Sequence, residues 1–220
     1  MPQKGNKRSE ALCARNALLV QWLLTLPWRQ RNIRECRIGD PEQANLFKAE
    51  KPRFVHLALS PWIEDAIRLD PHFRFWQFHF RPHETKTGSK TGHEVRGIVP
   101  RQLLSPLEDY LDHHRPTLLR RSDPGTLFLN KAGGALSDCV VLNLVSSLTL
   151  RYVNRRVTPH IFRDIVAYKW LDDHPEDYLT LSKLLWHADI RTTLRIYGRS
   201  FDESNGAVRM EAWLEKRAAC

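Results

Sequence analysis

The run Thr158-Pro159-His160-Ile161-Phe162-Arg163 places an imidazole and a guanidinium three positions apart at the expected start of a helix. Thr158 is a good N-cap, and Pro159 suits the first helical position, where its missing N–H is no loss. Residues three apart share one face of a helix. Free N–H groups and the positive dipole end of this first turn favour an anion and disfavour a protonated imidazole. The pair therefore predicts an anion site in which Arg163 binds and His160 accepts a proton.

The H-x-x-R spacing is a weak signal by itself. A chain with 10 His and 24 Arg contains about one such pair by chance, and a second one does occur at 93–96. The first pair gains weight because Leu184-Leu185-Trp186-His187 follows it. Next comes a segment that Asp189 can cap and that Gly198 can end, with Tyr197 as its last helical residue. Taken alone, this helix would be interpreted as core packing with a buried aromatic residue.

Three motifs in this order, H-x-x-R, L-L-x-H and T-T-x-x-I-Y, make the chain resemble the tyrosine recombinase (phage integrase) family. The residues that carry the resemblance are His160, Arg163, His187 and Tyr197. The family has two further residues upstream, an Arg after an early helix and a Lys on a β-hairpin. The matching positions are Arg29, with Arg31 and Arg34 as rivals, and Lys86, with Lys90 as its rival. The resemblance runs from about residue 11 to the C-terminus.

The resemblance implies transesterification at a DNA phosphodiester, without metal or cofactor. Tyr197 would attack phosphorus and form a 3′-phosphotyrosyl bond. A free phenol has a pKa of about 10, so His160 would accept its proton or order the phosphate. The other implied roles are charge stabilisation by Arg29 and Arg163, protonation of the leaving 5′ oxygen by Lys86, and a hydrogen bond to the phosphate from His187.

Three positions depart from the family pattern. The family has a second His directly after the H-x-x-R arginine, and here that residue is Asp164. Its L-L-G-H glycine is Trp186, and the acidic residue three after the first arginine is Asn32. None of these departures removes a group that would perform the chemistry, so they indicate a divergent branch and put the fine geometry in question.

The pattern of apolar residues predicts a mainly α fold with a small antiparallel β-sheet (α+β), like a tyrosine recombinase catalytic domain. We expect residues 1–10 to be a loose basic tail and residues 11–220 to form one undivided catalytic domain. The expected elements are helices at 11–26, 28–38, 103–111, 137–153 and from 159, a β-prone stretch at 54–59, strands at 73–80 and 95–99, and a turn at 85–92. Only 28 residues precede Arg29, which predicts the catalytic half alone, without the family's N-terminal core-binding domain.

The net charge of +9 comes from a basic set dominated by arginine. Arginine binds phosphate oxygens bidentately, so the composition favours a polyanionic partner. We expect double-stranded DNA, bound weakly and in a salt-sensitive way by this half of a clamp. The expected phosphate contacts are Arg31, Arg34, Lys90, Arg151, Arg155 and Arg156. A homo-oligomer on DNA is expected, with the helix predicted within 201–220 as its candidate contact.

The four cysteines are scattered, without C-x-x-C spacing, which predicts reduced thiols and no metal site. No apolar run is long enough for a membrane span, and the polar, basic N-terminus has no signal-peptide pattern. A cytoplasmic, DNA-associated protein is the expectation. Three alternatives to a site-specific recombinase or integrase stay open at this point: a DNA-binding relative with impaired catalysis, a topoisomerase-like enzyme that nicks and reseals DNA, and an RNA-binding protein without chemistry.

Overall fold

The computed structural model describes residues 4–54, 57–86, 88–120, 122–198, 210–211 and 215. The chain divides into two compact units, unit 1 (residues 1–166) and unit 2 (residues 167–220). The boundary falls inside a helix, α8 (Pro159–Asp173), whose first half belongs to unit 1 and whose second half belongs to unit 2. The sequence predicts one undivided domain because no Gly-, Pro- or Ser-rich linker marks a boundary that lies within a regular helix.

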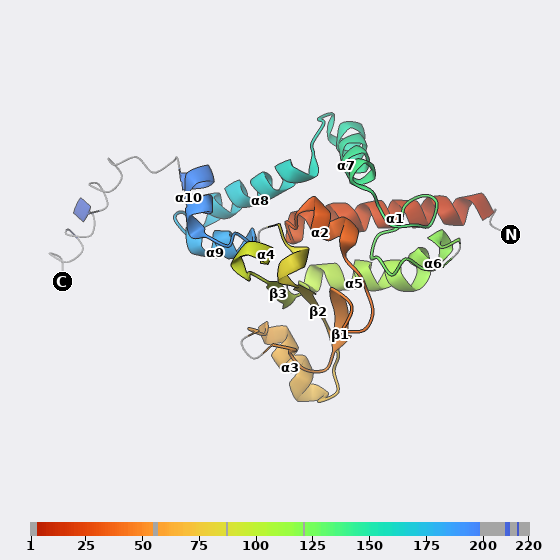
Figure 1. Cartoon of the computed structure of the whole chain (residues 1–220), viewed down its shortest axis with the longest axis horizontal. Coiled ribbons are helices and arrows are strands. Elements are labelled where there is room, and N and C mark those ends of the chain that lie inside the picture. The colour runs from red at the N-terminus through yellow and green to blue at the C-terminus, as the bar shows by residue number, and fades with distance from the viewer. Residues whose placement is uncertain are drawn as a thin grey trace. The chain divides into compact units, whose positions relative to one another are not determined.

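Unit 1 combines a helical layer with a small sheet. Its helices before α8 are α1 (Lys4–Thr25), α2 (Gln30–Glu35), α3 (Pro61–Leu69), α4 (Gly88–Thr91), α5 (Arg101–Asp109), α6 (Arg115–Leu118) and α7 (Asp138–Val153). A 3-10 turn, η1 (Pro82–Glu84), precedes α4, and a π-helical turn, η2 (Tyr110–His114), joins α5 to α6. The long α1 packs along the α5–η2–α6 segment (Figure 1).

The sheet has three antiparallel strands in the order β1 (Leu46–Ala49), β2 (Phe75–Phe80) and β3 (Val95–Ile98). Helix α3 lies in the connection between β1 and β2 (Figure 1). Three of the four phenylalanines that alternate through 73–80 are buried on β2, so this aromatic-rich stretch supplies the centre of the core.

Trp28 joins the helical layer to the sheet. Its fully buried ring lies edge-on to Phe78 and Phe80 of β2, with centroid distances of 5.1 and 4.9 Å, and to Trp22 of α1 at 5.0 Å. Such edge-to-face pairs add about 0.5–1.5 kcal/mol each beyond the area that they bury. The packing fixes the backbone directly before Arg29, because an immobile ring leaves the next residue little freedom.

Unit 2 is built from the second half of α8 together with α9 (Tyr178–Leu184) and α10 (Ile190–Tyr197). Its buried cluster consists of Ala167, Leu181, Leu185 and Tyr197. Both short helices have acidic N-caps. The Asp177 side chain accepts a hydrogen bond from the Thr180 N–H, and Asp189 accepts one from the Arg191 N–H.

The predicted fold class, mainly α with a small antiparallel sheet, is confirmed. The strands at 75–80 and 95–98 and the helix after Ser137 lie where the sequence predicts them. The Ser137 side chain caps α7 by accepting from the Val140 N–H. Helix α8 begins at Pro159, as its capping signals predict.

Three local predictions were wrong. The basic residues expected in a loose tail form helix from Lys4 onward, because Arg8 donates to the carbonyls of Thr117, Leu118 and Lys131 and so anchors that end of α1. The stretch 54–59 holds no strand in its described residues, and the first strand is the earlier β1. The expected turn at 85–92 contains the one-turn helix α4.

The helix predicted within 201–220 lies almost wholly outside the described residues. In the part of the chain that the structure does describe, no helix is both long enough and apolar enough to cross a bilayer.

Candidate active site

The first turn of α8 carries the arginine on which the anion-site prediction depends. Arg163 is 6% exposed, and its Nη1 donates a hydrogen bond to the carbonyl of Pro27. Helix α8 is itself held by α7, because Thr149 Oγ1 accepts from the Val157 N–H at 3.0 Å. This arrangement connects the first turn of α8 to the segment that ends in Arg29, so two of the predicted phosphate-binding residues belong to one interlocked region of unit 1.

Arg29 occupies the N-cap position of α2 and is half-buried. Burial lowers the pKa of its guanidinium, because the charged form loses solvation there. Its rivals are engaged elsewhere: Arg31 forms an ion pair with Glu35 at 2.8 Å, and Arg34 pairs with the same carboxylate at 3.0 Å. The choice of Arg29 over Arg31 and Arg34 as the anion ligand stays a prediction.

His160 lies in the first turn of α8, as predicted, but its environment differs from that of Arg163. Its side chain is 81% exposed, and its Nδ1 lies 3.9 Å from Oδ2 of Asp164. Residues three apart on a helix differ by about 60° around the axis, and here the edge of the buried stripe falls between them. His160 therefore faces solvent while Arg163 is turned inward.

Lys86 lies in a turn between η1 and α4, which we call the Lys86 turn (residues 82–86). Its side chain is exposed, and that of its rival Lys90 on α4 is exposed as well. The backbone of the turn is well anchored: Thr85 Oγ1 donates to the carbonyls of Pro82 and His93, both at 3.2 Å. The result is an exposed ammonium group next to a backbone that hydrogen bonds anchor.

His187 and Tyr197 lie in unit 2. The Nδ1 of His187 is 2.8 Å from Oγ1 of Thr193, a fully buried residue of α10. This contact holds the imidazole to the helix that carries Tyr197. When the hydroxyl donates to Nδ1, the neutral ring carries its proton on Nε2, and that N–H is a donor for an anion.

Tyr197 is the last residue of α10 and is only 5% exposed. Its ring lies edge-on to that of Tyr168, with centroids 5.6 Å apart and planes at 86°. The sequence predicts Ile190 and Leu194 on the same buried face, but both are substantially exposed, and Thr193 occupies that face instead. Thr193 and Tyr197 are one turn apart, so their direction, rather than that of the apolar pair, defines the inward face of α10.

The three departures from the family pattern have structural counterparts. Trp186 has φ 55°, in the left-handed region that glycine adopts readily and L-residues adopt at a cost of about 1–2 kcal/mol. Asn32 is buried, and its Nδ2 donates to the carbonyl of Glu84 at 3.1 Å, which an ionised carboxylate could not do. Asp164 lies one turn after His160, at the ion-pair distance given above.

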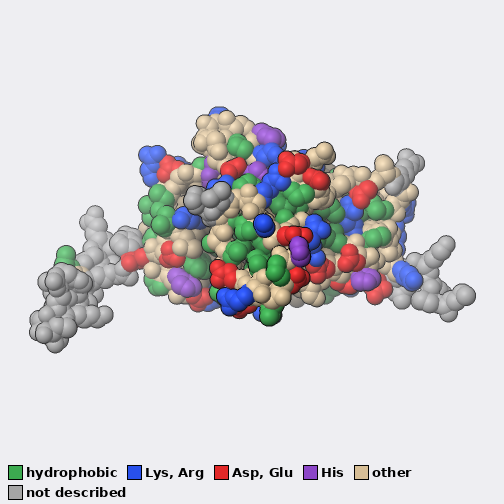
Figure 2. All heavy atoms as spheres, turned by 90° about the horizontal axis from the view of Figure 1, so that it is seen from below, with side chains coloured by type: hydrophobic (Ala, Val, Ile, Leu, Met, Phe, Trp, Pro, Cys, Tyr) green, Lys and Arg blue, Asp and Glu red, His purple; other side chains and the backbone are tan. Residues whose placement is uncertain are grey.

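The expected DNA-contacting residues differ in their availability. Arg151, Arg155 and Arg156 at the end of α7 are exposed, whereas Arg31 and Arg34 form the ion pairs described above. Figure 2 shows one face of the molecule on which acidic and basic side chains are interspersed. The exposed end of α7 is therefore the best-placed phosphate-contacting segment of the predicted set.

Sequence reasoning missed several supporting residues. Glu84, Asn45 and Arg37 form a hydrogen-bonded cluster beside the Lys86 turn, and Thr193 holds His187. The repeated Thr in the T-T-x-x-I-Y motif pointed to Thr193, but nothing in the local pattern pointed to Glu84. Among the described residues, no group of three or more His, Cys, Asp or Glu side chains is arranged to hold a metal ion.

Comparison with known proteins gives sequence similarity to three XerD tyrosine recombinases. That of Lacticaseibacillus casei is 34% identical over 129 residues, 58% of this chain and 42% of the relative. That of Staphylococcus saprophyticus is 31% identical over 88 residues, 40% of this chain and 30% of the relative. That of Chlorobaculum tepidum is 29% identical over 96 residues, 43% of this chain and 31% of the relative. The chain thus matches less than half the length of each, and it matches no protein-family model.

Solved structures share the fold over most of this chain. XerH recombinase, in a pre-cleavage complex with its difH substrate, gives a TM-score of 0.61 at 16% identity, over 92% of this chain and 48% of that one. XerA recombinase gives 0.55 at 18% identity, over 99% and 64%. The Tn1549 transposon integrase, in complex with circular intermediate DNA, gives 0.54 at 13% identity, over 90% and 59%. The chain is thus similar in sequence to XerD tyrosine recombinases over part of their length, and it has the fold of a tyrosine recombinase catalytic domain.

Proposed function

We propose that this chain cuts and rejoins double-stranded DNA at specific sites through a 3′-phosphotyrosine intermediate, as a site-specific recombinase or integrase. The observation that carries the proposal is the contact of buried Arg163 with the Pro27 carbonyl, two residues before Arg29. It anchors one guanidinium beside the segment that bears the other. Two neighbouring guanidinium groups are suited to bind and neutralise a phosphodiester whose negative charge increases during attack.

In the proposed reaction the Tyr197 oxygen attacks phosphorus and the bond from phosphorus to the 5′ oxygen breaks. His160 accepts the phenol proton, and Lys86 gives a proton to the departing 5′ oxygen. His187 donates a hydrogen bond to a phosphate oxygen. The phosphotyrosyl bond retains the energy of the bond it replaces, so resealing by the 5′ hydroxyl needs no nucleotide triphosphate.

The burial of Tyr197 adds a requirement to this reaction. With 5% of its surface exposed, Tyr197 offers little area to a DNA backbone. We therefore expect cleavage to involve a rearrangement of α10 that exposes the Tyr197 ring. Opening and closing of loops or domains on the microsecond to millisecond scale limits the rate of many enzymes.

DNA is the partner because XerH and the Tn1549 integrase, whose folds this chain shares, were solved in complex with DNA. The exposed arginines at the end of α7 supply phosphate contacts without sequence choice, and such contacts weaken steeply as salt concentration rises. We expect double-stranded DNA to bind weakly to this chain alone, and a homo-oligomer to form on DNA.

A nicked suicide DNA substrate tests the proposal. The substrate loses a short 5′ fragment after cleavage, so the covalent intermediate accumulates and can be counted as a denaturant-stable protein–DNA adduct. We expect an adduct with the unmodified chain and none with Tyr197→Phe, because only the hydroxyl differs. Tyr178→Phe, on α9, is the matched control and should behave like the unmodified chain. Equal adduct yields from the unmodified chain and Tyr197→Phe would refute the assignment of Tyr197 as the nucleophile, and no adduct from either would favour a protein that only binds DNA.

A further inference from the structure

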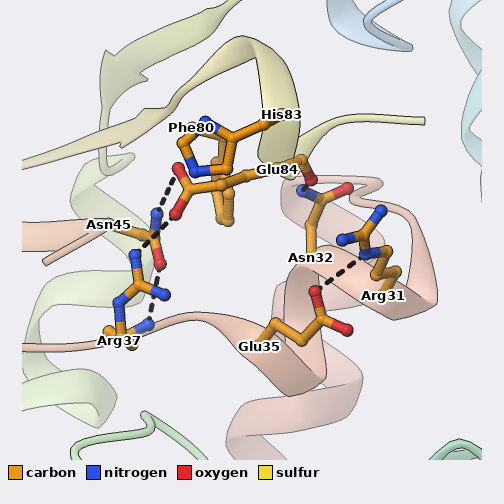
Figure 3. Close-up of a pocket in the computed structure, with 8 residues that line it drawn as sticks. All are labelled: Arg31, Asn32, Glu35, Arg37, Asn45, Phe80, His83 and Glu84. Carbon is orange, nitrogen blue, oxygen red and sulfur yellow. Dashed lines mark hydrogen bonds and ion pairs between the residues drawn. The ribbon is translucent and has the colours of Figure 1, made fainter. Parts of the chain in front are cut away.

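The Lys86 turn is held by one residue that the proposed chemistry does not use directly. Glu84 lies two positions before Lys86, and its side chain is only 12% exposed. It lines a polar cavity of about 150 Å³ together with residues of α2 and the segment that follows α2. Figure 3 shows the Glu84 carboxylate next to Arg37 and Asn45, with dashed lines joining it to both.

Four donors converge on Glu84. Its Oε1 accepts from Arg37 Nη2 at 2.5 Å, and its Oε2 accepts from Asn45 Nδ2 at 3.0 Å and from the Arg81 N–H at 2.7 Å. Its backbone carbonyl accepts from Asn32 Nδ2 at 3.1 Å. Charge-assisted bonds of this kind are about twice as strong as neutral ones. The bond from the Arg81 N–H closes the turn on the residue before it. The other three bonds attach the turn to α2 and to the segment that follows α2.

The donors connect two candidate catalytic positions. Asn32 belongs to α2, whose N-cap is Arg29, and Arg37 lies just beyond the end of the same helix. Through Glu84, the turn that carries Lys86 is therefore attached to the helix that begins at Arg29. Because Lys86 itself is exposed, its position relative to a phosphate held at Arg29 depends on this attachment of the backbone.

The other end of the turn is equally constrained. Thr85 Oγ1 accepts from the Gly88 N–H at 3.0 Å while donating to the two carbonyls named above. A Cβ on Gly88 would lie 2.3 Å from the Pro82 oxygen and 2.4 Å from the His93 oxygen, so only glycine fits. Hydrogen bonds and close contacts thus hold the backbone near Lys86, while its side chain is exposed.

The charge of Glu84 is stable at neutral pH. Burial alone would raise the pKa of its carboxyl, but hydrogen bonds from the Arg81 N–H, Asn45 and Arg37 outweigh that effect and hold the pKa below its ordinary value. The carboxylate is therefore ionised at neutral pH, and its charge-assisted hydrogen bonds are in place there.

We propose that Glu84 is a positioning residue for proton donation by Lys86, holding the Lys86 turn in register with α2 so that the ammonium group reaches the leaving 5′ oxygen. This inference rests on the proposed function, because it assigns a role within the same cleavage step. Glu84 contacts neither DNA nor the reacting atoms. Its effect is transmitted through the backbone of residues 84–86.

A change of leaving group tests the role of Glu84. In an ordinary suicide substrate the P–O5′ bond breaks and the 5′ oxygen needs a proton. In a substrate with sulfur at the bridging 5′ position the P–S bond breaks and a thiolate leaves. A thiol has a pKa of about 8.5, so the thiolate departs without a proton donor. A defect in general-acid catalysis disappears on the sulfur substrate, whereas a defect in folding, DNA binding or attack persists.

The experiment compares adduct formation rates for the full chain and its variants on both substrates. We expect Glu84→Gln to lower the rate at least tenfold on the oxygen substrate and less than threefold on the sulfur substrate. Lys86→Ala should show the same pattern with a larger oxygen defect. Glu42→Gln is the matched control, because it removes an ion pair with Arg53 away from the turn. It should match the unmodified chain on both substrates.

A milder variant protects the test against misfolding. Arg37→Gln removes the charged partner of Glu84 from a half-exposed position and should give a smaller defect that sulfur also corrects. The positioning role is wrong if Glu84→Gln lowers the rate of adduct formation equally on both substrates while the sulfur substrate restores the rate of Lys86→Ala. A rate unchanged in Glu84→Gln would overturn it as well. If the sulfur substrate does not restore the rate of Lys86→Ala, Lys86 is not the proton donor and the inference loses its premise. No adduct from the unmodified chain on either substrate would refute the proposed function, and the inference with it.

Discussion

The region around the Lys86 turn in unit 1 and the α9–α10 pair in unit 2 are stabilised in different ways. The Lys86 turn is held by hydrogen bonds and an ion pair that converge on Glu84, with side chains that reach back to α2. Tyr197 of α10 is held by apolar packing in a small cluster. Directional bonds fix geometry, whereas apolar contacts tolerate sliding and release. If the proposed roles hold, the backbone that carries Lys86 is fixed by directional bonds, whereas the proposed nucleophile Tyr197 lies in an apolar cluster.

Of the substitutions that test this difference between the two regions, a change at Arg163 in unit 1 should have the largest effect. Arg163→Lys keeps the positive charge but loses the planar donor fork and the reach to the Pro27 carbonyl. We expect the rate of adduct formation on the suicide substrate to fall about 100-fold or more, the usual cost of one transition-state donor. Arg68→Lys, on the exposed face of α3, should leave the rate unchanged. A loss below threefold in Arg163→Lys would mean that directional bonds do not hold this part of the site.

Backbone strain in unit 2 gives the next largest effect. At most positions glycine is less stable than alanine, but Trp186 has a positive φ at which the preference reverses. We expect Trp186→Gly to be more stable than Trp186→Ala by about 1 kcal/mol, with both below the unmodified chain because a buried ring is lost. Urea unfolding measures the difference. The matched pair Leu184→Gly and Leu184→Ala, at the end of α9, should show the ordinary order with alanine ahead.

Tyr168 tests whether apolar packing restrains the nucleophile. Tyr168→Ala removes the edge-on partner of Tyr197 and should destabilise α10 by about 0.5–1.5 kcal/mol. Faster hydrogen exchange at the α10 amides would report that loss. The rate of adduct formation should rise a few-fold if release of Tyr197 limits cleavage, and Tyr168→Phe, which keeps the ring, should not change it. An unchanged rate in Tyr168→Ala would show that another step is limiting.

The smallest effect expected is a pH dependence specific to unit 1. The pKa of Glu84 is lowered in the folded chain, so its contribution is complete above the unfolded value of about 4.3 and is lost as pH falls through the folded value. The charged groups that face it are Arg37 and Arg81. The difference in urea midpoint between the unmodified chain and Glu84→Gln should be constant from pH 7 to 5 and shrink below about pH 4.3. A difference independent of pH would mean that the cluster acts through neutral hydrogen bonds alone.

Local signals in the sequence predicted the fold and much of the candidate site. The capping signals at Thr158-Pro159 and Asp189 predicted helix starts, because capping depends on residues within one turn. The alternation of aromatic residues at 73–80 predicted β2, because this signal too depends only on neighbouring residues. The four-residue β1 was missed because its apolar pair, Leu46 and Phe47, carries no alternation, and the more apolar 54–59 competed with it.

What the sequence could not show depends on contacts between distant residues. Asn32, Arg37 and Asn45 reach Glu84 across 39–52 positions, and no periodic pattern records such a meeting. The exposure of His160 also depends on where the buried stripe of α8 ends, which packing rather than spacing decides. The unit boundary inside α8 cannot be found from composition, because a helix shared by two units has the same sequence pattern as any other helix.

The connection that carries α3 has a consequence for engineering this chain. Ala49 and Phe75 are direct partners in the sheet although residues 50–74 separate them. Partners in an antiparallel pair lie about 4.5–5.5 Å apart, a gap that a two-residue turn can close. The connection is therefore a modular insertion that could be exchanged for a tight hairpin or for a reporter domain. Buried Gln77 limits the exchange: it donates to the Lys51 carbonyl and accepts from the Arg53 N–H, so a shortened chain should also carry Gln77→Val.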